Sequence, residues 1–421
     1  MNILMLTNTF TPHVGGVARS VETFAAEYRS RGHKVLVVAP EFDNQPANEM
    51  DVVRIPAIQN FNGSDFSVAL PIPGLLKDIL ETFQPDIVHS HHPYLLGMTA
   101  LRIARYRQLP VVFTHHTMYE QYTHYVPLDS PVFSRFVIEL ATRYANLCDQ
   151  VFAPSESISE LLHQRGVKSP ITVIPTGVDN ERFRHGDGAQ FRVSQAISEK
   201  AFLVGHLGRL APEKNLEFLT TAVAQFLKKN PHAEFLVVGT GPSETQIREI
   251  FDRAGLNERL HIVGILRSDD LINAYHAMNV FVFASRSETQ GMVLTEAMAA
   301  GLPVVGLDAP GVREVIKDKL NGRLLLEPSI EKFADCLQWI ESQTKTNLET
   351  LKLNALQTAD DFSMSHSASK ALTCYENLRT QTLLTRPQQY ESLKQLHNLL
   401  KIEWEIVKGM ASATSAAFED N

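Results

Sequence analysis

Cysteine is scarce in this chain of 421 residues, which holds only Cys148, Cys336 and Cys374, far apart in the sequence. This spacing argues against both a disulfide framework and a zinc site. Long apolar runs are also lacking, whereas a membrane span needs about 20 apolar residues. The first residues lack the basic and apolar regions of a signal peptide. These absences predict a cytoplasmic protein that is soluble or peripheral to a membrane.

A positive net charge is lacking as well. The chain carries 39 Lys and Arg against 47 Asp and Glu, for a formal charge of −8. Proteins that bind nucleic acid through phosphate contacts are usually basic, so no nucleic-acid partner is expected. A length of 421 residues predicts two or three domains.

Short apolar segments alternate with amphipathic ones twice along the chain. Such alternation indicates parallel strands joined by helices, hence an α/β protein with two doubly wound, Rossmann-like domains. Ligands bind at the carboxyl ends of such strands, so the expected site is a cleft between two facing domains. The predicted strands are 3–6, 35–39, 87–89, 111–114, 150–153 and 172–174 in the first half, and 202–207, 234–238, 261–263, 280–283, 304–307 and 323–326 in the second.

A polar stretch that begins near Arg184 interrupts this rhythm and reads as a linker. We therefore expect an amino-terminal domain over 1–190, a second domain over 191–361, and helices and a tail over 362–421 that cross back to the first domain. Within the second domain, Ser243 and Gln246 have the spacing of a helix capping box.

Two glutamates eight residues apart, Glu288 and Glu296, are the most informative feature of the chain. The alanine-rich segment from Met292 to Ala300 reads as a buried helix, and an unpartnered polar group inside it would cost roughly 2 to 7 kcal/mol. A sugar diol is a fitting partner for Glu296. Gly291 opens the helix, and the free N–H groups of its first turn, at Met292 and Val293, would bind an anion.

Glycines and cations follow other predicted strands. Gly15 and Gly16 come between the first strand and a helix, where paired glycines allow a phosphate or sugar to touch the backbone. Arg209 and Lys214 follow the first strand of the second half and suit a diphosphate. The alternative for these cations is a surface salt bridge with a neighbouring glutamate, Glu213 or Glu217.

Two further turns follow strands of the second half. The turn that contains Gly241 lacks the third glycine of a dinucleotide fingerprint, and the turn ending at Leu266 offers backbone groups to a nucleotide base. Gly241 and Leu266 are both predicted to contact a bound nucleotide sugar, the donor of a sugar group. A turn with a purely structural role explains these residues nearly as well.

Histidines gather after two strands of the first half, at His89, His91, His92, His115 and His116. Their spacing matches no usual metal-ligand set, and no Asp-x-Asp pair is present to hold Mg²⁺ on a diphosphate. No metal is therefore expected, and a hydrogen bond from one histidine to the sugar is the better use.

Taken together, these motifs resemble the retaining glycosyltransferases of family 4, which have the GT-B fold. The resemblance covers nearly the whole chain. It implies that Glu296 binds the ribose, Glu288 faces the donor sugar, and Arg209 and Lys214 hold the diphosphate; it also implies that His116 contacts the sugar. The matching segments are 15–16, 85–89, 113–116, 174–179, 208–209, 214–215, and Glu288 with Glu296.

The form Glu-Thr-Gln-Gly at 288–291, with the segment 117–125, is similar to bacterial diacylglycerol glucosyltransferases and implies a lipid acceptor. Many family members carry Phe where this chain has Gln290. The amphipathic segment 131–144 either packs on the core or rests on a membrane surface. The tail after Arg386 contains another amphipathic stretch, 393–407, for which domain packing, membrane docking and disorder stay open.

The expected activity is transfer of a hexose, glucose from UDP-glucose, to an alcohol with retention of configuration and without a metal or other cofactor. Arg209, Lys214 and the helix that starts at Gly291 would stabilise the departing diphosphate. The alternatives are a family 4 transferase with a soluble or polysaccharide acceptor, and a regulator that binds nucleotide sugars without turnover. An epimerase or phosphorylase has no signature in the sequence.

Overall fold

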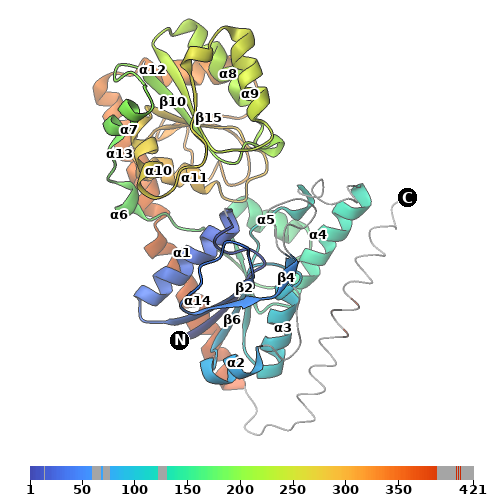
Figure 1. Ribbon diagram of the computed structural model, residues 1–421. Coiled ribbons are helices and arrows are strands. Elements are labelled where there is room, and N and C mark those ends of the chain that lie inside the picture. Colours follow the sequence, from blue (N-terminus) through green and yellow to red (C-terminus); the bar gives the residue numbers. More distant parts are fainter. Residues whose placement is uncertain are drawn as a thin grey trace. The chain divides into compact units, whose positions relative to one another are not determined.

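The computed structural model describes residues 1–13, 15–58, 68–69, 76–121 and 130–385, together with residues 404, 406 and 408. The chain forms two compact units. Unit 1 comprises Met1–Thr176 and Ser367–Asn421, and unit 2 comprises Gly177–His366. Each unit contains a parallel sheet with helices around it, which confirms the predicted α/β class (Figure 1).

Unit 1 is built on a sheet of seven parallel strands in the order β3-β2-β1-β6-β7-β8-β9. The prediction identified six of these strands and missed β3, which follows a polar segment, as well as the antiparallel pair β4 (Ala57–Ile58) and β5 (Val68–Ala69). The strands of the main sheet are β1 (Asn2–Leu6), β2 (Lys34–Pro40), β3 (Val52–Ile55), β6 (Ile87–Ser90), β7 (Val111–Thr114), β8 (Gln150–Ala153) and β9 (Ile171–Val173).

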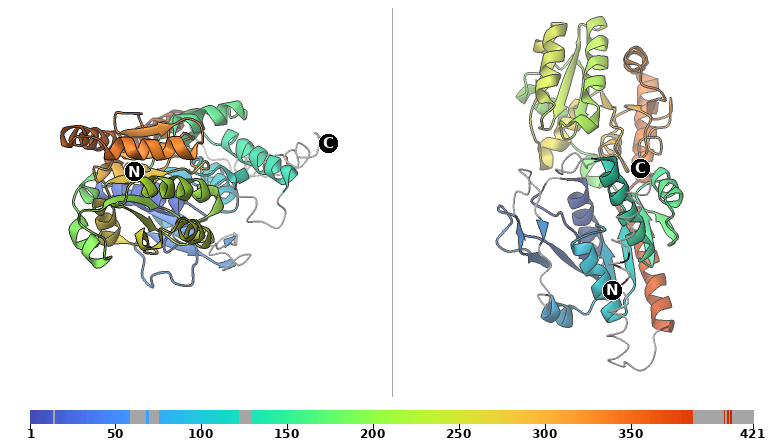
Figure 2. Two further views of the ribbon diagram at one scale, coloured as in Figure 1. Left: turned by 90° about the horizontal axis from the view of Figure 1, so that it is seen from above. Right: turned by 90° about the vertical axis from the view of Figure 1, so that its right-hand side faces the viewer.

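Helices lie on both faces of this sheet. The helices are α1 (Gly16–Ser30), α2 (Lys77–Phe83), α3 (Leu96–Arg107), α4 (Pro131–Asn146), α5 (Glu156–Gln164) and α14 (Met364–Thr385). Although α1 and α14 are far apart in the sequence, they meet through Tyr28 and Tyr375, whose ring centroids are 5.8 Å apart. Figure 2 shows α14 from two further sides. From Ser367 onward the chain belongs to unit 1.

Unit 2 has six parallel strands in the order β12-β11-β10-β13-β14-β15. All six were predicted, three of them with the observed bounds. The strands are β10 (Phe202–Leu207), β11 (Ala233–Val238), β12 (Leu260–Ile262), β13 (Val280–Phe283), β14 (Val304–Leu307) and β15 (Gly322–Leu325). Buried apolar side chains on both faces explain why these strands read as continuous apolar runs.

Separate apolar cores cover the two faces of the second sheet. One core packs side chains of α8 (Leu216–Lys229), α9 (Glu244–Ala254) and α12 (Ile330–Glu341) against the strands. The other packs α7 (Gly188–Ser194), α10 (Ser268–Ala277), α11 (Met292–Ala299) and α13 (Lys345–Asp361). Three short helices complete the unit, α6 (Asn180–Phe183) and the 3-10 turns η3 (Pro212–Lys214) and η4 (Asn257–Arg259).

The unit boundary differs from the expected one after residue 190. The segment that was read as a linker packs within unit 2: Arg184 pairs with Asp360 at 2.6 Å, and Arg192 donates to the Ala277 carbonyl at 2.8 Å. Gly188 lies so close to α10 that a Cβ would come within 2.2 Å of the His276 carbonyl oxygen. The sequence prediction read this polar segment as a linker because each of these contacts joins residues distant in sequence and so leaves no local signal.

The predicted capping box is wrong. Ser243 is the residue before α9, but its side chain makes no capping hydrogen bond, and its backbone is helical rather than extended. Gln246 instead donates to Glu217 at 3.0 Å. The helix begins where expected, although its first turn uses other partners.

The two amphipathic segments behave differently from one another. In α4 only Ala141, Thr142, Tyr144 and Ala145 are buried, at its carboxyl end, and the earlier apolar side chains are half-buried. Most of the predicted stretch 393–407 lies outside the described residues. Of its described positions, Trp404 is 65% exposed, whereas Ile406 is 3% exposed and joins the core of unit 1.

Candidate functional site

The sheet of unit 2 reverses its winding between β10 and β13, which are neighbours in the sheet although two strands, β11 and β12, lie between them in the sequence. In doubly wound sheets the crevice at such a reversal, outside the carboxyl ends of the strands, is where ligands bind. Two loops leave the sheet there, 208–215 after β10 and 284–291 after β13. They carry Arg209, Lys214 and Glu288, and the second leads directly into α11 with Glu296.

Backbone contacts hold the first of these loops in place. The N–H of Gly208 donates to Val238 at 3.0 Å, and that of Leu210 donates to Thr240 at 2.9 Å. A Cβ at Gly241 would lie 2.3 Å from the Leu210 carbonyl oxygen, so only glycine allows this close approach. The structure therefore gives Gly241, a predicted donor-binding residue, a packing role at the edge of the site.

The two cations of this loop each pair with a glutamate. Lys214 Nζ lies 2.5 Å from Glu288 Oε1, and both side chains are largely buried. Arg209 forms an ion pair with Glu213 and is half-exposed. Asn215, which belongs to a segment that carries the family resemblance but was assigned no role, is left-handed at φ 54° and donates to the Ala284 carbonyl at 3.2 Å. The alternative of a salt bridge with Glu213 is thus confirmed for Arg209, and Lys214 pairs with Glu288. Diphosphate binding by the two cations stays a prediction.

Helix α11 presents its amino terminus to the same edge. Gly291 precedes it with φ 72°, a conformation that favours glycine. Met292 and Val293, in the first turn, are partly buried. The N–H groups of a first helical turn have no carbonyl partner four residues back, and they favour an anion. The predicted start of the helix is confirmed.

Glu296 is 3% exposed, in agreement with the prediction that this helix is buried. The prediction that a carboxylate buried here needs a partner is confirmed, because the hydroxyl of Tyr275 donates to Glu296 Oε2 at 2.9 Å, and a sugar diol as a further partner stays a prediction. Tyr275 lies on α10, 21 positions earlier, so no local sequence signal links the two residues. A carboxylate can accept up to about four hydrogen bonds, so this partner leaves the chemistry of a diol acceptor intact.

Leu266, the last predicted donor-binding residue of unit 2, follows β12 and is partly buried against the core. Its strand neighbours β11, and Gly239 donates to the Gly264 carbonyl at 2.8 Å. This contact places the turn after β12 at the same carboxyl edge of the sheet as Gly241. The turn lies two strands away from β10, where the winding reverses.

Gly15, Gly16 and His116 lie in unit 1. The glycines join the β1 loop to α1, and at Gly16 a Cβ would meet no heavy atom within 4 Å. At Gly15 a Cβ would crowd the ring of His13 at 3.0 Å. His116 follows β7, and its Nε2 lies 2.9 Å from His91 Nδ1. All three residues are therefore at the carboxyl edge of their own sheet, as predicted.

The other histidines of this edge are structural in large part. His89 bonds through one ring nitrogen to Thr114 at 2.7 Å and through the other to Tyr375 at 2.6 Å. Burial lowers the pKa of His89, His92 and His115 to about 3, and that of His91 well below its ordinary value. These four rings are consequently neutral at physiological pH.

No group of three or more His, Cys, Asp or Glu side chains suited to a metal ion occurs within the described ranges. Over the same part of the chain, no helix is long and apolar enough to cross a membrane.

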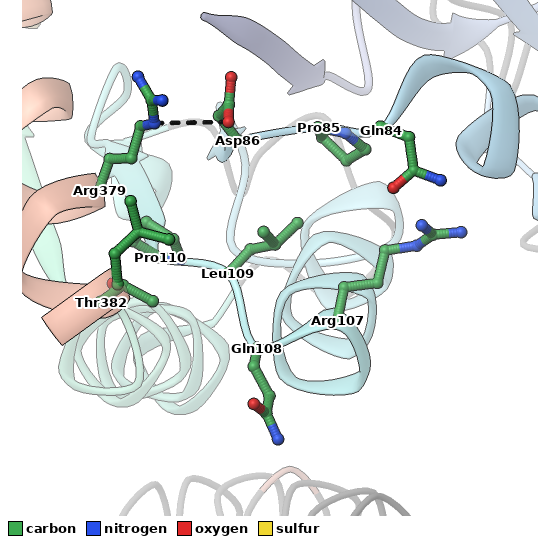
Figure 3. Close-up of a pocket in the computed structure, with 10 residues that line it drawn as sticks. Gln84, Pro85, Asp86, Arg107, Gln108, Leu109, Pro110, Arg379 and Thr382 are labelled. Carbon is green, nitrogen blue, oxygen red and sulfur yellow. Dashed lines mark ion pairs between the residues drawn. The ribbon is translucent and has the colours of Figure 1, made fainter. Parts of the chain in front are cut away.

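A pocket of about 310 Å³ lies elsewhere in unit 1, at the amino ends of β6 and β7 (Figure 3). Asp86 and Arg379, which line it, are joined at 3.5 Å, and Arg379 comes from α14. Because ligands of doubly wound sheets bind at the opposite, carboxyl edge, this pocket is separate from the predicted site residues.

Two doubly wound α/β units, with cations, glutamates and a helix amino terminus at a strand reversal, define the class of two-domain GT-B glycosyltransferases. A profile described as Glycosyltransferase Family 4 matches residues 14–182, and one described as Glycosyl transferases group 1 matches residues 187–355. The alpha-monoglucosyldiacylglycerol synthase of Streptococcus pneumoniae is 30% identical over 77% of this chain and 75% of its own length. The chain therefore belongs to glycosyltransferase family 4.

Other relatives differ in the substrates that their names state. A GDP-mannose-dependent alpha-mannosyltransferase of Corynebacterium glutamicum is 28% identical over 77% of this chain and 76% of its length. Among solved structures, Anabaena HepE in complex with UDP matches with a TM-score of 0.70 and 22% identity, over 90% of this chain and 100% of that one. Sucrose-phosphate synthase of Thermosynechococcus elongatus matches with a TM-score of 0.73 and 20% identity, over 90% and 99%. These structural matches support the fold.

Proposed function

We propose that this glycosyltransferase moves glucose from UDP-glucose to the hydroxyl of a diacylglycerol-type lipid, with retention of configuration and without a metal ion. The observation that carries the proposal is the ion pair of Lys214 and Glu288 at the strand reversal, beside the amino terminus of α11. It joins a cation suited to phosphate with a carboxylate suited to a sugar hydroxyl.

In this proposal the nucleotide sugar lies along the carboxyl edge of the second sheet. Glu296 accepts hydrogen bonds from the ribose, and Lys214 and Arg209 contact the diphosphate. Their charge, with the N–H groups of Met292 and Val293, stabilises the phosphate oxygens as the bond to the sugar breaks. Glu288 then faces the hexose. The departing phosphate takes the proton of the acceptor hydroxyl, which gives retention without a second carboxylate.

The choice of lipid and of glucose rests on relatives. Besides the Streptococcus pneumoniae synthase, the alpha-monoglucosyldiacylglycerol synthase of Acholeplasma laidlawii is 27% identical over 72% of this chain. HepE has also been solved with UDP-glucose, at a TM-score of 0.68. Since the Corynebacterium relative is GDP-mannose-dependent, a different donor is the competing proposal.

A donor-by-acceptor screen tests these points together. Purified protein is mixed with UDP-glucose, UDP-galactose or GDP-mannose, and with diacylglycerol in vesicles or a soluble alcohol, each with and without EDTA. We expect an α-glucolipid to form with UDP-glucose and vesicles, at a rate that EDTA leaves unchanged. Loss of activity with EDTA would contradict the metal-independent mechanism, and a β-linked product would contradict retention. Absence of turnover with every donor, despite UDP binding, would indicate a regulator.

A further inference from the structure

An imidazole stands at the strand reversal itself, where the neighbouring positions are apolar. His206 is the next-to-last residue of β10 and only 2% exposed. The ladder between β10 and β13 ends at the pair Gly205 and Phe281, and beyond it the His206 side chain bridges the two strands. Its Nδ1 lies 3.1 Å from the Val282 carbonyl oxygen, and its ring stacks on Phe281 with centroids 6.3 Å apart.

The bond to Val282 determines the chemistry of the other ring nitrogen. A carbonyl oxygen only accepts hydrogen bonds, so His206 Nδ1 must carry the hydrogen. Burial lowers the pKa of the ring to about 4, against an opposing contribution from the Val282 bond. The ring is therefore neutral at physiological pH, and Nε2 is a hydrogen-bond acceptor.

This acceptor has no hydrogen-bond partner among the residues that the structure describes. A buried polar atom without a partner typically costs about 1 to 3 kcal/mol. The other residues of β10 are apolar or glycine, so the strand itself does not explain why a histidine with an unpaired nitrogen stands here. A bound ligand can supply the missing donor.

Nε2 is shielded from solvent, and the free volume nearest to it lies beside Gly208. A Cβ built on Gly208 would have His206 Nε2, at 3.7 Å, as its one near heavy-atom neighbour outside the adjacent residues of the described chain. Gly208 begins the loop that carries Arg209 and Lys214. The charges of Lys214 and Glu288 both act on the His206 ring, which places it in their electrostatic neighbourhood.

The chemistry of Nε2 selects among the parts of a nucleotide sugar. A neutral acceptor repels the oxygens of a diphosphate, which are acceptors themselves. Hydroxyl groups of the ribose and the hexose donate. We propose that His206 Nε2 accepts a hydrogen bond from one sugar hydroxyl of the bound nucleotide sugar, in the open space beside Gly208. This assignment rests on the proposed function, since it requires a nucleotide sugar at this edge.

His206→Phe and His206→Gln test the proposal. Phe keeps an aromatic ring for stacking but removes both ring nitrogens, so it loses the acceptor as well as the donor to Val282. Gln retains one donor for Val282 and one acceptor. We expect His206→Phe to raise the donor KM about 5- to 20-fold with kcat within about 3-fold of wild type, and His206→Gln to recover most of the loss, as for one neutral hydrogen bond. His261→Phe is the matched control, because His261 lies on β12 and its Nε2 is already paired with Glu234 at 2.6 Å.

Donors that lack one hydroxyl at a time identify the partner and need no mutation of the core. The analogue without the bonding hydroxyl should bind the wild type about 5- to 20-fold more weakly, yet bind wild type and His206→Phe equally. A 2′- or 3′-deoxyribose effect would assign the ribose, and a deoxyglucose effect the hexose. If an active wild-type enzyme shows the same donor KM as His206→Phe, or if no analogue loses its sensitivity to that substitution, the assignment of His206 is wrong.

The two proposals fail in distinguishable ways. Without turnover of any nucleotide sugar by the wild type, the proposed function itself fails. If His206→Phe does not fold, as judged by far-UV circular dichroism and thermal melting, the comparison of wild type with His206→Gln across the analogues decides the question.

Discussion

Lys214 and Glu288, 74 positions apart in the chain, form an ion pair of 2.5 Å at the strand reversal of unit 2. Each is mostly shielded from solvent, and each follows a different strand, β10 and β13. A pair between two groups that are both proposed to bind the donor has to open, at least in part, when a diphosphate and a sugar take their places. The pair therefore holds both side chains near their proposed positions before the donor binds.

We expect Lys214→Ala to lower kcat by about 10² to 10³, because one charged donor to the developing phosphate charge is lost. The fold should survive, since removing one partner of a pair at the edge of a sheet disturbs no core residue. Steady-state rates and thermal melting measure the two effects. Lys229→Ala, at the exposed end of α8, is the control and should leave both unchanged. Turnover at the wild-type level in Lys214→Ala would contradict the assigned role.

Substitutions of Tyr275 and of Glu296, which are joined by a hydrogen bond, should affect different properties: the first the stability of the fold, the second the binding of the donor. Tyr275→Phe removes a donor from a buried carboxylate, so we expect a loss of about 1.5 to 3 kcal/mol in the free energy of unfolding. Glu296→Gln retains a side chain that hydrogen-bonds, and it should mainly weaken UDP binding, by about 10-fold, as for a charged hydrogen bond to the ribose. Chemical denaturation and titration calorimetry measure the two quantities. Equal UDP affinity in Glu296→Gln and wild type would argue against a ribose contact.

Two glycines at the sheet edges should respond to alanine in opposite ways. Gly241→Ala places a methyl group 2.3 Å from the Leu210 carbonyl oxygen at φ 153°, so we expect a loss of stability of about 1 to 3 kcal/mol. Gly16→Ala adds a methyl group in open space at the first position of α1, and stability should stay the same or rise by up to about 1 kcal/mol. If Gly16 contacts the donor, as predicted, its variant will show a higher donor KM despite normal melting. An unchanged KM would remove Gly16 from the donor site.

We expect unit 1 to unfold in acid at a higher pH than most proteins do, because four of its histidines are buried and neutral. These are His89, His91, His92 and His115. In the folded chain, burial lowers the pKa of His89, His92 and His115 to about 3 and that of His91 well below its ordinary value, whereas the pKa of an unfolded histidine is about 6.5. Below about pH 6.5 the unfolded chain binds protons that the folded chain does not, so stability is full above this pH and falls with acid. Four groups together cost about 5 kcal/mol per pH unit, which predicts an unfolding midpoint near pH 5.

His115→Phe gives this prediction a specific test. Both ring nitrogens of His115 lack hydrogen-bond partners within the described part of the chain. The substitution should therefore be tolerated at pH 7 and should shift the acid midpoint to lower pH, as followed by near-UV circular dichroism. His163→Phe, at an exposed position of α5, should leave the midpoint where it is. An unshifted midpoint in His115→Phe would show that this ring does not take part in acid unfolding.

The predicted strands of unit 2 agree with the structure because burial on both faces makes a parallel strand an unbroken apolar run. The start of α11 could likewise be predicted from the sequence, because Gly291 and the alanine-rich segment after it are local features. The capping box predicted at Ser243 is absent because the Gln246 side chain donates to Glu217 on α8 instead. A local sequence pattern cannot show that a residue distant in sequence offers a better hydrogen-bond partner. Similarly, the polar segment after Arg184 is polar because it pairs with Asp360, not because it is a linker.

Residue order alone therefore determined the α/β class, every strand of the two main sheets except β3, and the positions that follow them, because local apolar spacing and glycine conformation encode these features. Tertiary structure alone decided that Lys214 pairs with Glu288, that Tyr275 bonds to Glu296, and that His206 has a buried acceptor beside Gly208. Each of these relationships arises where strands or helices distant in sequence become neighbours, and a hydrogen bond depends on a separation of about 3 Å that no spacing along the chain specifies.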